Sequence, residues 1–439
     1  MDLVLRNATL ADGRSGIDIA IENGRIAALR PHLDIVGREE IDVAGRLVSP
    51  PFVDAHFHLD TALSLGFPRL NRSGTLIEGI ALWREIEPHL SHEWLVERGL
   101  QYCDWAIAQG IQAIRSHVDT THAALTGVTA MLEVKRAVKD YLDLQLVAFP
   151  QQGIYRAPGG LANLERALDL GVEVVGGIPH FERTAADGTR SVVALCEIAA
   201  KRGLLVDLHC DETDDPASRH IETLTAETIR LGLKGRTAGS HLTSMHSMDN
   251  YYTSKLIPLM AEAEIQAIAN PLANVTLQGR HDTYPKRRGM MRVPELMAAG
   301  VNVAFGHDSV MDPFYSLGTG DMLAVASMGI HLGHMTGIDQ MNSCFAAVTE
   351  NAARALHLEG YGLAPGKYGD LVVLDARDPI DAIRRSAARL YVVRRGRIIA
   401  RSAPRTASLA IPGRPPTIDF VPTVKPPTQK LAVAASAAE

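Results

Sequence analysis

The 439-residue sequence predicts an α/β protein, a (β/α)8 TIM barrel with a small β-sandwich domain built from both chain ends. Eight short, mostly apolar runs between residues 53 and 309 predict parallel strands, because strands buried on both faces have nearly continuous hydrophobic sequences. Amphipathic segments separate these runs, and such alternation is typical of a parallel sheet covered by helices. Eight repeats favour a closed barrel over an open sheet.

The two ends of the chain have a different pattern. Residues 2–49 alternate β-prone runs with turn signals, including the hairpin dipeptide Asn23-Gly24. Similar runs return in residues 369–376 and 390–401, so we expect both ends to form one small sheet. The predicted domains are 1–49 with 356–412 for the β-sandwich, 50–355 for the barrel, and 413–439 for a Pro- and Ala-rich C-terminal tail.

The composition favours a small-molecule ligand. The formal net charge is −6 and no block of Lys or Arg occurs, which argues against nucleic acid or an acidic membrane surface as a partner. The chain lacks a signal-peptide pattern and an apolar run of the roughly 18 residues that span a bilayer, so we expect a cytoplasmic protein. Four scattered cysteines without CxxC spacing are typical of reduced thiols.

Polar side chains follow the ends of the predicted strands, where barrel enzymes gather their catalytic groups. His56 and His58 end the first strand, and residues two apart on a strand point to the same side. Two imidazoles near the barrel axis can bind one divalent ion, and a third imidazole with a carboxylate would complete the site. His209 and Asp308, which end two other strands, are the candidates.

Other polar residues near strand ends have structural interpretations. Cys210 follows the inward-pointing His209, so its thiol should face the helices and be inert. The remaining assignments are capping or loop solvation for Asp211, Asp214 and Asp215, a supporting role for His246, packing for Trp83 and Trp105, and loop ion pairs for residues 284–289.

Several long motifs carry a resemblance to a known family. PPFVDAHFHLD, DLHCDE, ANPLANVTLQGRHDTYPKRRG and FGHDSVMDPFYSLGTGDML resemble the amidohydrolase superfamily and, within it, the bacterial cytosine deaminases. The resemblance implies a homo-oligomer with a nucleobase-like small-molecule substrate. The implied ligands of one divalent metal ion (Zn or Fe, with Mn possible) are His56, His58, His209 and Asp308.

The resemblance also implies catalytic roles. Glu212 would shuttle protons, His241 would hydrogen-bond the nucleophile, and Asp308 would accept a proton from water. The implied substrate contacts are Gln151, Leu76, Ser309 and Phe314. Two-metal members of the superfamily usually bridge their ions with a carboxylated lysine at the end of the fourth barrel strand, and VEVVGGIPHFE has no lysine, which favours one ion.

The predicted reaction is hydrolytic deamination of a cytosine-like aminopyrimidine through attack of a metal-bound hydroxide. The family carries a second acid after the metal aspartate and a Trp in the DPxY segment, where this chain has Ser309 and Phe314. The smaller, uncharged serine predicts room for 5-methylcytosine or isocytosine as well as cytosine. The alternatives are a cyclic amide hydrolase of the dihydroorotase or hydantoinase kind and a non-catalytic paralogue.

Overall fold

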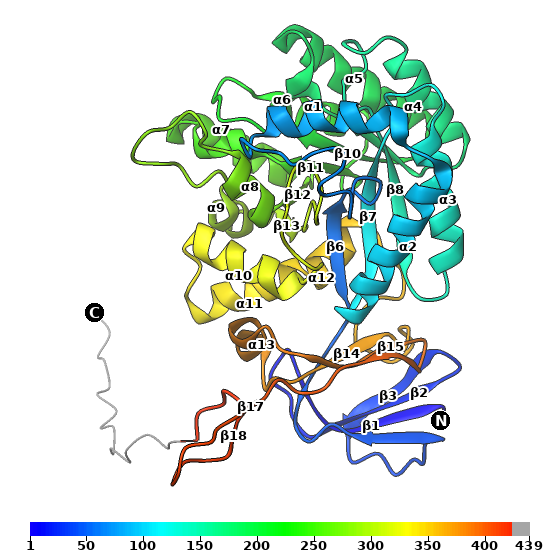
Figure 1. The fold of residues 1–439 in the computed structure, drawn as a ribbon, viewed down its shortest axis with the longest axis vertical. Coiled ribbons are helices and arrows are strands. Elements are labelled where there is room, and N and C mark those ends of the chain that lie inside the picture. Colours follow the sequence, from blue (N-terminus) through cyan, green and yellow to red (C-terminus); the bar gives the residue numbers. More distant parts are fainter. Residues whose placement is uncertain (424–439) are drawn as a thin grey trace.

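The computed structural model describes residues 1–423, and eight parallel strands form the predicted barrel within them (Figure 1). Each strand pairs with its sequence neighbour, which is the order of a (β/α)8 barrel. The strands are β6 (Phe52–Phe57), β7 (Ile111–Asp119), β8 (Asp143–Phe149), β9 (Val174–Gly177), β10 (Leu205–Cys210), β11 (Thr237–His241), β12 (Gln266–Ala269) and β13 (Asn302–Phe305).

The barrel closes next to the predicted ligands. β6 and β13 approach each other through a parallel bridge between Phe57 and Asp308. The Asp308 amide donates to the His56 carbonyl at 2.9 Å, and the His58 amide donates to the Asp308 carbonyl at 3.0 Å. The backbone that closes the barrel therefore also fixes three of the predicted ligands relative to one another.

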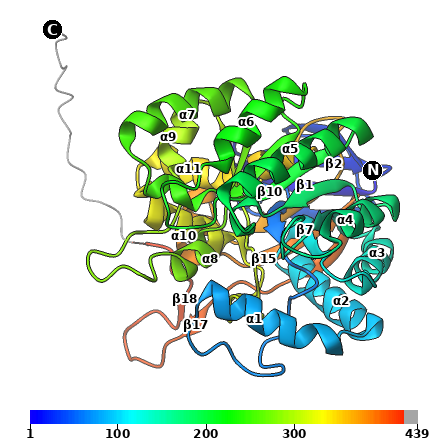
Figure 2. The same cartoon turned by 90° about the horizontal axis from the view of Figure 1, so that it is seen from above.

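Helices surround the strands, as the view from above shows (Figure 2). Local signals set their ends: Thr184 caps α5 by accepting from the Asp187 amide, and Gly203 ends it with φ +70°. The helices are α1 (Leu76–Ile86), α2 (His92–Ala108), α3 (Thr126–Val138), α4 (Gly160–Asp169), α5 (Ala185–Arg202), α6 (His220–Arg230), α7 (Asn250–Glu262), α8 (Pro271–Leu277), α9 (Val293–Ala298), α10 (Met322–Gly333), α11 (Ile338–Ala347), α12 (Glu350–Ala355) and α13 (Pro379–Arg385). Short 3₁₀ turns lie at Glu87–His89, Pro179–Phe181 and Thr243–His246.

A second sheet combines both ends of the chain, as predicted, and lies at the end of the barrel opposite α1 (Figure 1). Its order is β16-β15-β14-β5-β1-β2-β3, with β4 paired to β1. The turn between β2 and β3 holds Asn23 and Gly24 at φ +51° and +74°, as the dipeptide predicts. The strands are β1 (Leu3–Leu10), β2 (Ile17–Glu22), β3 (Arg25–Pro31), β4 (Glu39–Asp42), β5 (Leu47–Ser49), β14 (Leu371–Leu374), β15 (Arg389–Arg394) and β16 (Arg397–Arg401).

The predicted tail is described only to residue 423, and residues 424–439 lie outside the described part of the chain. Two short strands, β17 (Ala407–Ser408) and β18 (Thr417–Ile418), pair near its start, which the Pro-rich composition did not indicate. Arg384 and Arg385 of α13 donate to the carbonyls of Phe420 and Asp419 and hold this segment against the chain. Among the described residues, no helix combines the length and hydrophobicity needed to cross a bilayer.

Candidate active site

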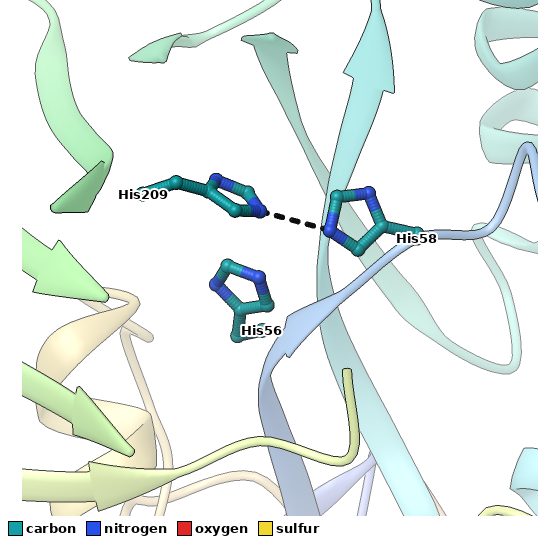
Figure 3. A group of neighbouring side chains, drawn as sticks. All are labelled: His56, His58 and His209. Carbon is teal, nitrogen blue, oxygen red and sulfur yellow. Dashed lines mark hydrogen bonds between the residues drawn. The ribbon is translucent and has the colours of Figure 1, made fainter. Parts of the chain in front are cut away.

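The four predicted metal ligands converge at the carboxyl ends of the barrel strands. The Nε2 atoms of His58 and His209 lie 3.0 Å apart, with the ring of His56 beside them (Figure 3). Asp308 Oδ1 lies 3.4 Å from His56 Nε2 and 3.5 Å from His58 Nε2. Ligand atoms around a tetrahedral ion with bonds of about 2.0–2.1 Å are roughly 3.3 Å apart. The spacing therefore fits four ligands of one divalent ion.

The hydrogen bonding of these histidines supports the same interpretation. Neither ring nitrogen of His56 nor Nδ1 of His209 has a hydrogen-bond partner among the described residues, although all three atoms are buried. Buried polar atoms without partners are rare and call for an unseen ion or ligand. Burial lowers the pKa of His58 to about 3, which keeps the imidazole in the neutral form that binds metals.

A buried ion pair lies next to the ligands and was not foreseen from the sequence. Arg115 Nη1 contacts Asp207 Oδ2 at 2.9 Å, and Ser240 Oγ donates to Asp207 Oδ1 at 2.6 Å. His117 packs against His56 with ring centroids 4.1 Å apart and lies 3.9 Å from Asp207. His56, His117 and Asp207 could also hold an ion. Since Arg115 already neutralises Asp207, this second group attracts a cation less strongly.

Glu212 and His241 face each other beside the ligands, with Glu212 Oε1 3.6 Å from His241 Nδ1. Both side chains are almost completely buried. Burial, and then repulsion from Asp308, raises the pKa of Glu212 well above its usual value. Both effects favour the proton-carrying form, which a proton donor requires.

The tautomer of His241 follows from two asparagines that the sequence analysis did not single out. Asn274 Oδ1 accepts from the Asn270 backbone amide at 3.1 Å, and this bond orients the Asn274 side-chain amide. Asn274 Nδ2 then donates to His241 Nδ1 at 2.9 Å. This contact favours Nδ1 as the acceptor, with the proton of the neutral ring on Nε2, while Asn270 Nδ2 lies 3.3 Å from Nδ1 and 3.4 Å from Nε2. Both asparagines lie in ANPLAN, a motif that carried the resemblance but received no residue assignment.

A cavity of about 600 Å³ opens over this group. Every predicted substrate contact lines this cavity: Gln151, Leu76, Ser309 and Phe314. His58, His209, Asp308, Glu212 and His241 also line it. Other wall residues, among them Ile80, Ile178 and His180, were not predicted, because only the fold brings them to this cavity.

The residues predicted to be structural have structural contacts. Cys210 is buried in the hydrophobic cluster between the barrel strands and the surrounding helices (the outer core), which also contains Cys196 and Ile221. Burial raises the pKa of its thiol. Asp211 accepts from the His220 and Ile221 amides at 3.1 and 2.8 Å and so caps the start of α6.

The other loop acids also match the structural interpretation. Asp214 accepts from the Gly279 amide at 2.8 Å, and Asp215 accepts from the Ala217 amide at 2.8 Å. His246 accepts from the Gly289 amide at 3.0 Å. These contacts tie loops together around the cavity.

The two tryptophans and the basic loop also have packing roles. Trp83 is buried, and its indole N–H donates to Asp119 Oδ2 at 3.1 Å, while Trp105 packs against the outer core. In residues 284–289, Arg287 pairs with Asp282 at 2.7 Å and donates to Ser247 Oγ at 2.7 Å. The loop is therefore held by ion pairs and hydrogen bonds, as predicted.

The fourth barrel strand, β9, continues into Ile178, Pro179 and His180. No lysine stands there, as the sequence indicated.

Comparisons with known proteins agree with the geometry of the site. The model of a family described as "Amidohydrolase family" matches residues 39–400. The chain is 41% identical to 5-methylcytosine deaminase from Klebsiella pneumoniae, whose crystal structure with 5-fluorocytosine superposes with a TM-score of 0.89 over 91% of this chain and 98% of that one.

Curated relatives span nearly the whole chain as well. N-isopropylammelide isopropyl amidohydrolase from Pseudomonas sp. strain ADP is 29% identical over 91% of this chain and 97% of its own length. Pterin deaminase from Rhizobium rhizogenes is 28% identical over 90% of each chain.

Proposed function

The chain belongs to the amidohydrolase family, and from this premise we propose that it is a metal-dependent deaminase of a cytosine-like aminopyrimidine. It is a hydrolase acting on C–N bonds, as its deaminase and amidohydrolase relatives are. One observation carries the narrower proposal: Gln151, Glu212 and three of the predicted ligands, His58, His209 and Asp308, line a single cavity. The likeness to 5-methylcytosine deaminase supports a pyrimidine substrate.

The donor set of three neutral imidazoles and one carboxylate fits a single Zn, Fe or Mn ion. His56, His58, His209 and Asp308 would hold it. A divalent ion in such a site lowers the pKa of bound water and supplies a nucleophile near neutral pH.

Side chains in the cavity carry out the proton transfers. Glu212, buried and carrying its proton, donates to a ring nitrogen and makes the neighbouring amidine carbon more electrophilic. Having given its proton to the ring, Glu212 accepts a proton from the attacking water and transfers it to the departing amine, so ammonia leaves. Asp308 accepts the other proton of that water and returns it to Glu212. His241 directs its Nε2–H as a donor, since Asn274 occupies Nδ1.

Gln151 and the segment after β13 would recognise the substrate ring. The buried Gln151 amide offers one donor face and one acceptor face, the complement of a ring N–H beside a carbonyl. Ser309 is buried, uncharged and small, and with Phe314 it leaves room for a substituted ring. We therefore propose that 5-methylcytosine or isocytosine is accepted at least as well as cytosine.

An ammonia-release screen tests the proposal. Purified protein reconstituted with Zn, Fe or Mn is assayed on cytosine, 5-methylcytosine, isocytosine, isoguanine and creatinine. Ammonia from the substituted or isomeric pyrimidines supports the proposal, and rapid ammonia release from cytosine alone contradicts the substrate range. Ring-opened products without ammonia would instead favour a cyclic amide hydrolase.

A further inference from the structure

Gly79 is buried at the end of the first turn of α1, and glycine is a poor helix former. A Cβ atom at this position would lie 2.8 Å from Cδ1 and 3.1 Å from Cε1 of Phe314. It would also lie 3.3 Å from the Pro313 carbonyl oxygen. Cβ atoms do not approach carbon atoms this closely, so any side chain here forces a neighbour to move.

The backbone on both sides of this contact is fixed. Asn71 Nδ2 donates to the Thr75 carbonyl just before α1 and to the Pro313 carbonyl, at 3.1 and 3.0 Å. Asp312 Oδ1 accepts from the Phe314 amide at 2.8 Å. Since α1 and the 312–314 segment are tied together, a clash at Gly79 is relieved mainly by rotation of the Phe314 ring.

The ring has the substrate cavity on one side. Phe314 lines that cavity together with Ser309, and α1 contributes Leu76 and Ile80 to the same wall. In the present packing the ring fills the space that Gly79 leaves empty and stays against α1. A displaced ring would occupy the volume beside Ser309.

We infer that Gly79 is a specificity-determining residue: by admitting the Phe314 ring against α1, it keeps open the space for a substituent on the substrate ring. This inference rests on the proposed function. Gly79 itself contacts no substrate and acts through Phe314.

The test is the ratio of kcat/KM for 5-methylcytosine to kcat/KM for cytosine. Gly79→Ala is expected to lower this ratio about tenfold, since one methyl group in an apolar pocket is worth roughly 10- to 200-fold. Adding Phe314→Leu to Gly79→Ala removes the clash and is expected to return the ratio to within about threefold of wild type. Phe314→Leu alone is the remaining variant of this double-mutant cycle.

Gly127→Ala is the matched control. Gly127 also lies in a helix, α3, but a Cβ atom there would meet Val118 at 3.5 Å, an ordinary contact. The ratio of kcat/KM for 5-methylcytosine to kcat/KM for cytosine is expected to be the same in Gly127→Ala as in wild type. Circular dichroism and melting curves of each variant verify that the ratios come from folded protein.

The outcomes separate the inference from the proposed function. An active wild type with an unchanged ratio in Gly79→Ala, or a lowered ratio that Phe314→Leu does not restore, overturns the inference alone. Deamination of cytosine without 5-methylcytosine also overturns it and leaves a cytosine deaminase standing. A wild type that releases ammonia from isocytosine alone overturns the inference, and one that deaminates none of the three pyrimidines overturns both.

Discussion

Two buried polar clusters lie on strand β10 and just after its end. They differ in whether their polar atoms have hydrogen-bond partners. The ligand cluster consists of His56, His58, His209 and Asp308, and three of its buried ring nitrogens have no hydrogen-bond partner among the described residues. The Asp211 cluster consists of Asp211, Ser218, His220 and Ile221.

The Asp211 cluster is fully paired. Asp211 Oδ1 accepts from Ser218 Oγ at 2.6 Å and contacts His220 Nδ1 at 2.8 Å, while both carboxylate oxygens accept backbone amides. Buried polar groups normally find partners, so a paired cluster stabilises the fold and an unpaired one is kept for something it binds. The two clusters should therefore respond oppositely to substitution.

The largest effect is expected in the ligand cluster. His209→Ala should lower kcat/KM by about 10⁴-fold or more, because it removes one member of a unit that acts together. The metal-free variant should lose about 1–2 kcal/mol against metal-free wild type, from the packing of the ring on Phe149 (centroids 4.0 Å apart), since Nδ1 had no hydrogen-bond partner to lose. Steady-state kinetics and urea unfolding measure the two effects. A large loss of stability with activity retained would reverse the comparison.

The next effect concerns Glu212, which lines the cavity beside the ligands but is not one of them. Glu212→Gln keeps the size of the side chain and removes its acid function, so kcat should fall by roughly 10²–10⁴-fold. Bound metal should be unchanged. Loss of the metal from this variant would show that Glu212 belongs to the ligand cluster.

Asp211→Asn tests the paired cluster. The amide cannot accept the Ile221 and His220 N–H groups with both of its ends, so the free energy of unfolding should fall by about 3 kcal/mol. Activity per folded molecule should remain. The prediction fails if the variant is as stable as wild type in urea.

Cys210→Ala sharpens the comparison, because Cys210 lies between His209 and Asp211 and faces the outer core. The expected cost is about 1 kcal/mol of unfolding free energy, from lost packing and from the weak hydrogen bond that the thiol donates to Asp211 Oδ2 at 3.5 Å. Kinetics and metal content should match wild type. A change in either would place the thiol in the site.

The smallest effect is expected for an ion pair near the surface, between the exposed Arg287 and the half-buried Asp282. Hydrogen bonding from Arg287 lowers the pKa of Asp282 to about 2, below the value of about 3.9 in an unfolded chain. The stabilisation from this pair is therefore present above about pH 4 and is lost as the pH falls through about 2. The stability difference between wild type and Arg287→Gln, from urea unfolding, should be constant from pH 7 to 5 and narrow by pH 3. A difference that widens toward pH 3 would contradict this.

The sequence predicted the barrel and the convergence of the ligands because both depend on local pattern. His56 and His58 are two residues apart on a strand, and the carboxyl ends of parallel strands meet at one end of a barrel. Their convergence with His209 and Asp308 therefore needed only the strand order.

Features that depend on packing between distant segments could not be predicted. Asn274 orients His241 from a helix that follows the next strand, and Gly79 meets Phe314 across 235 residues of sequence. The pairing of β17 with β18 was likewise hidden by a composition that is typical of an extended segment.

The most direct test of the account is the metal content of His209→Ala beside that of Asp211→Asn, purified in parallel and measured by inductively coupled plasma mass spectrometry. About one divalent ion per chain is expected in wild type and in Asp211→Asn, and none in His209→Ala. Wild type free of metal after reconstitution, or His209→Ala with a full complement, would contradict it.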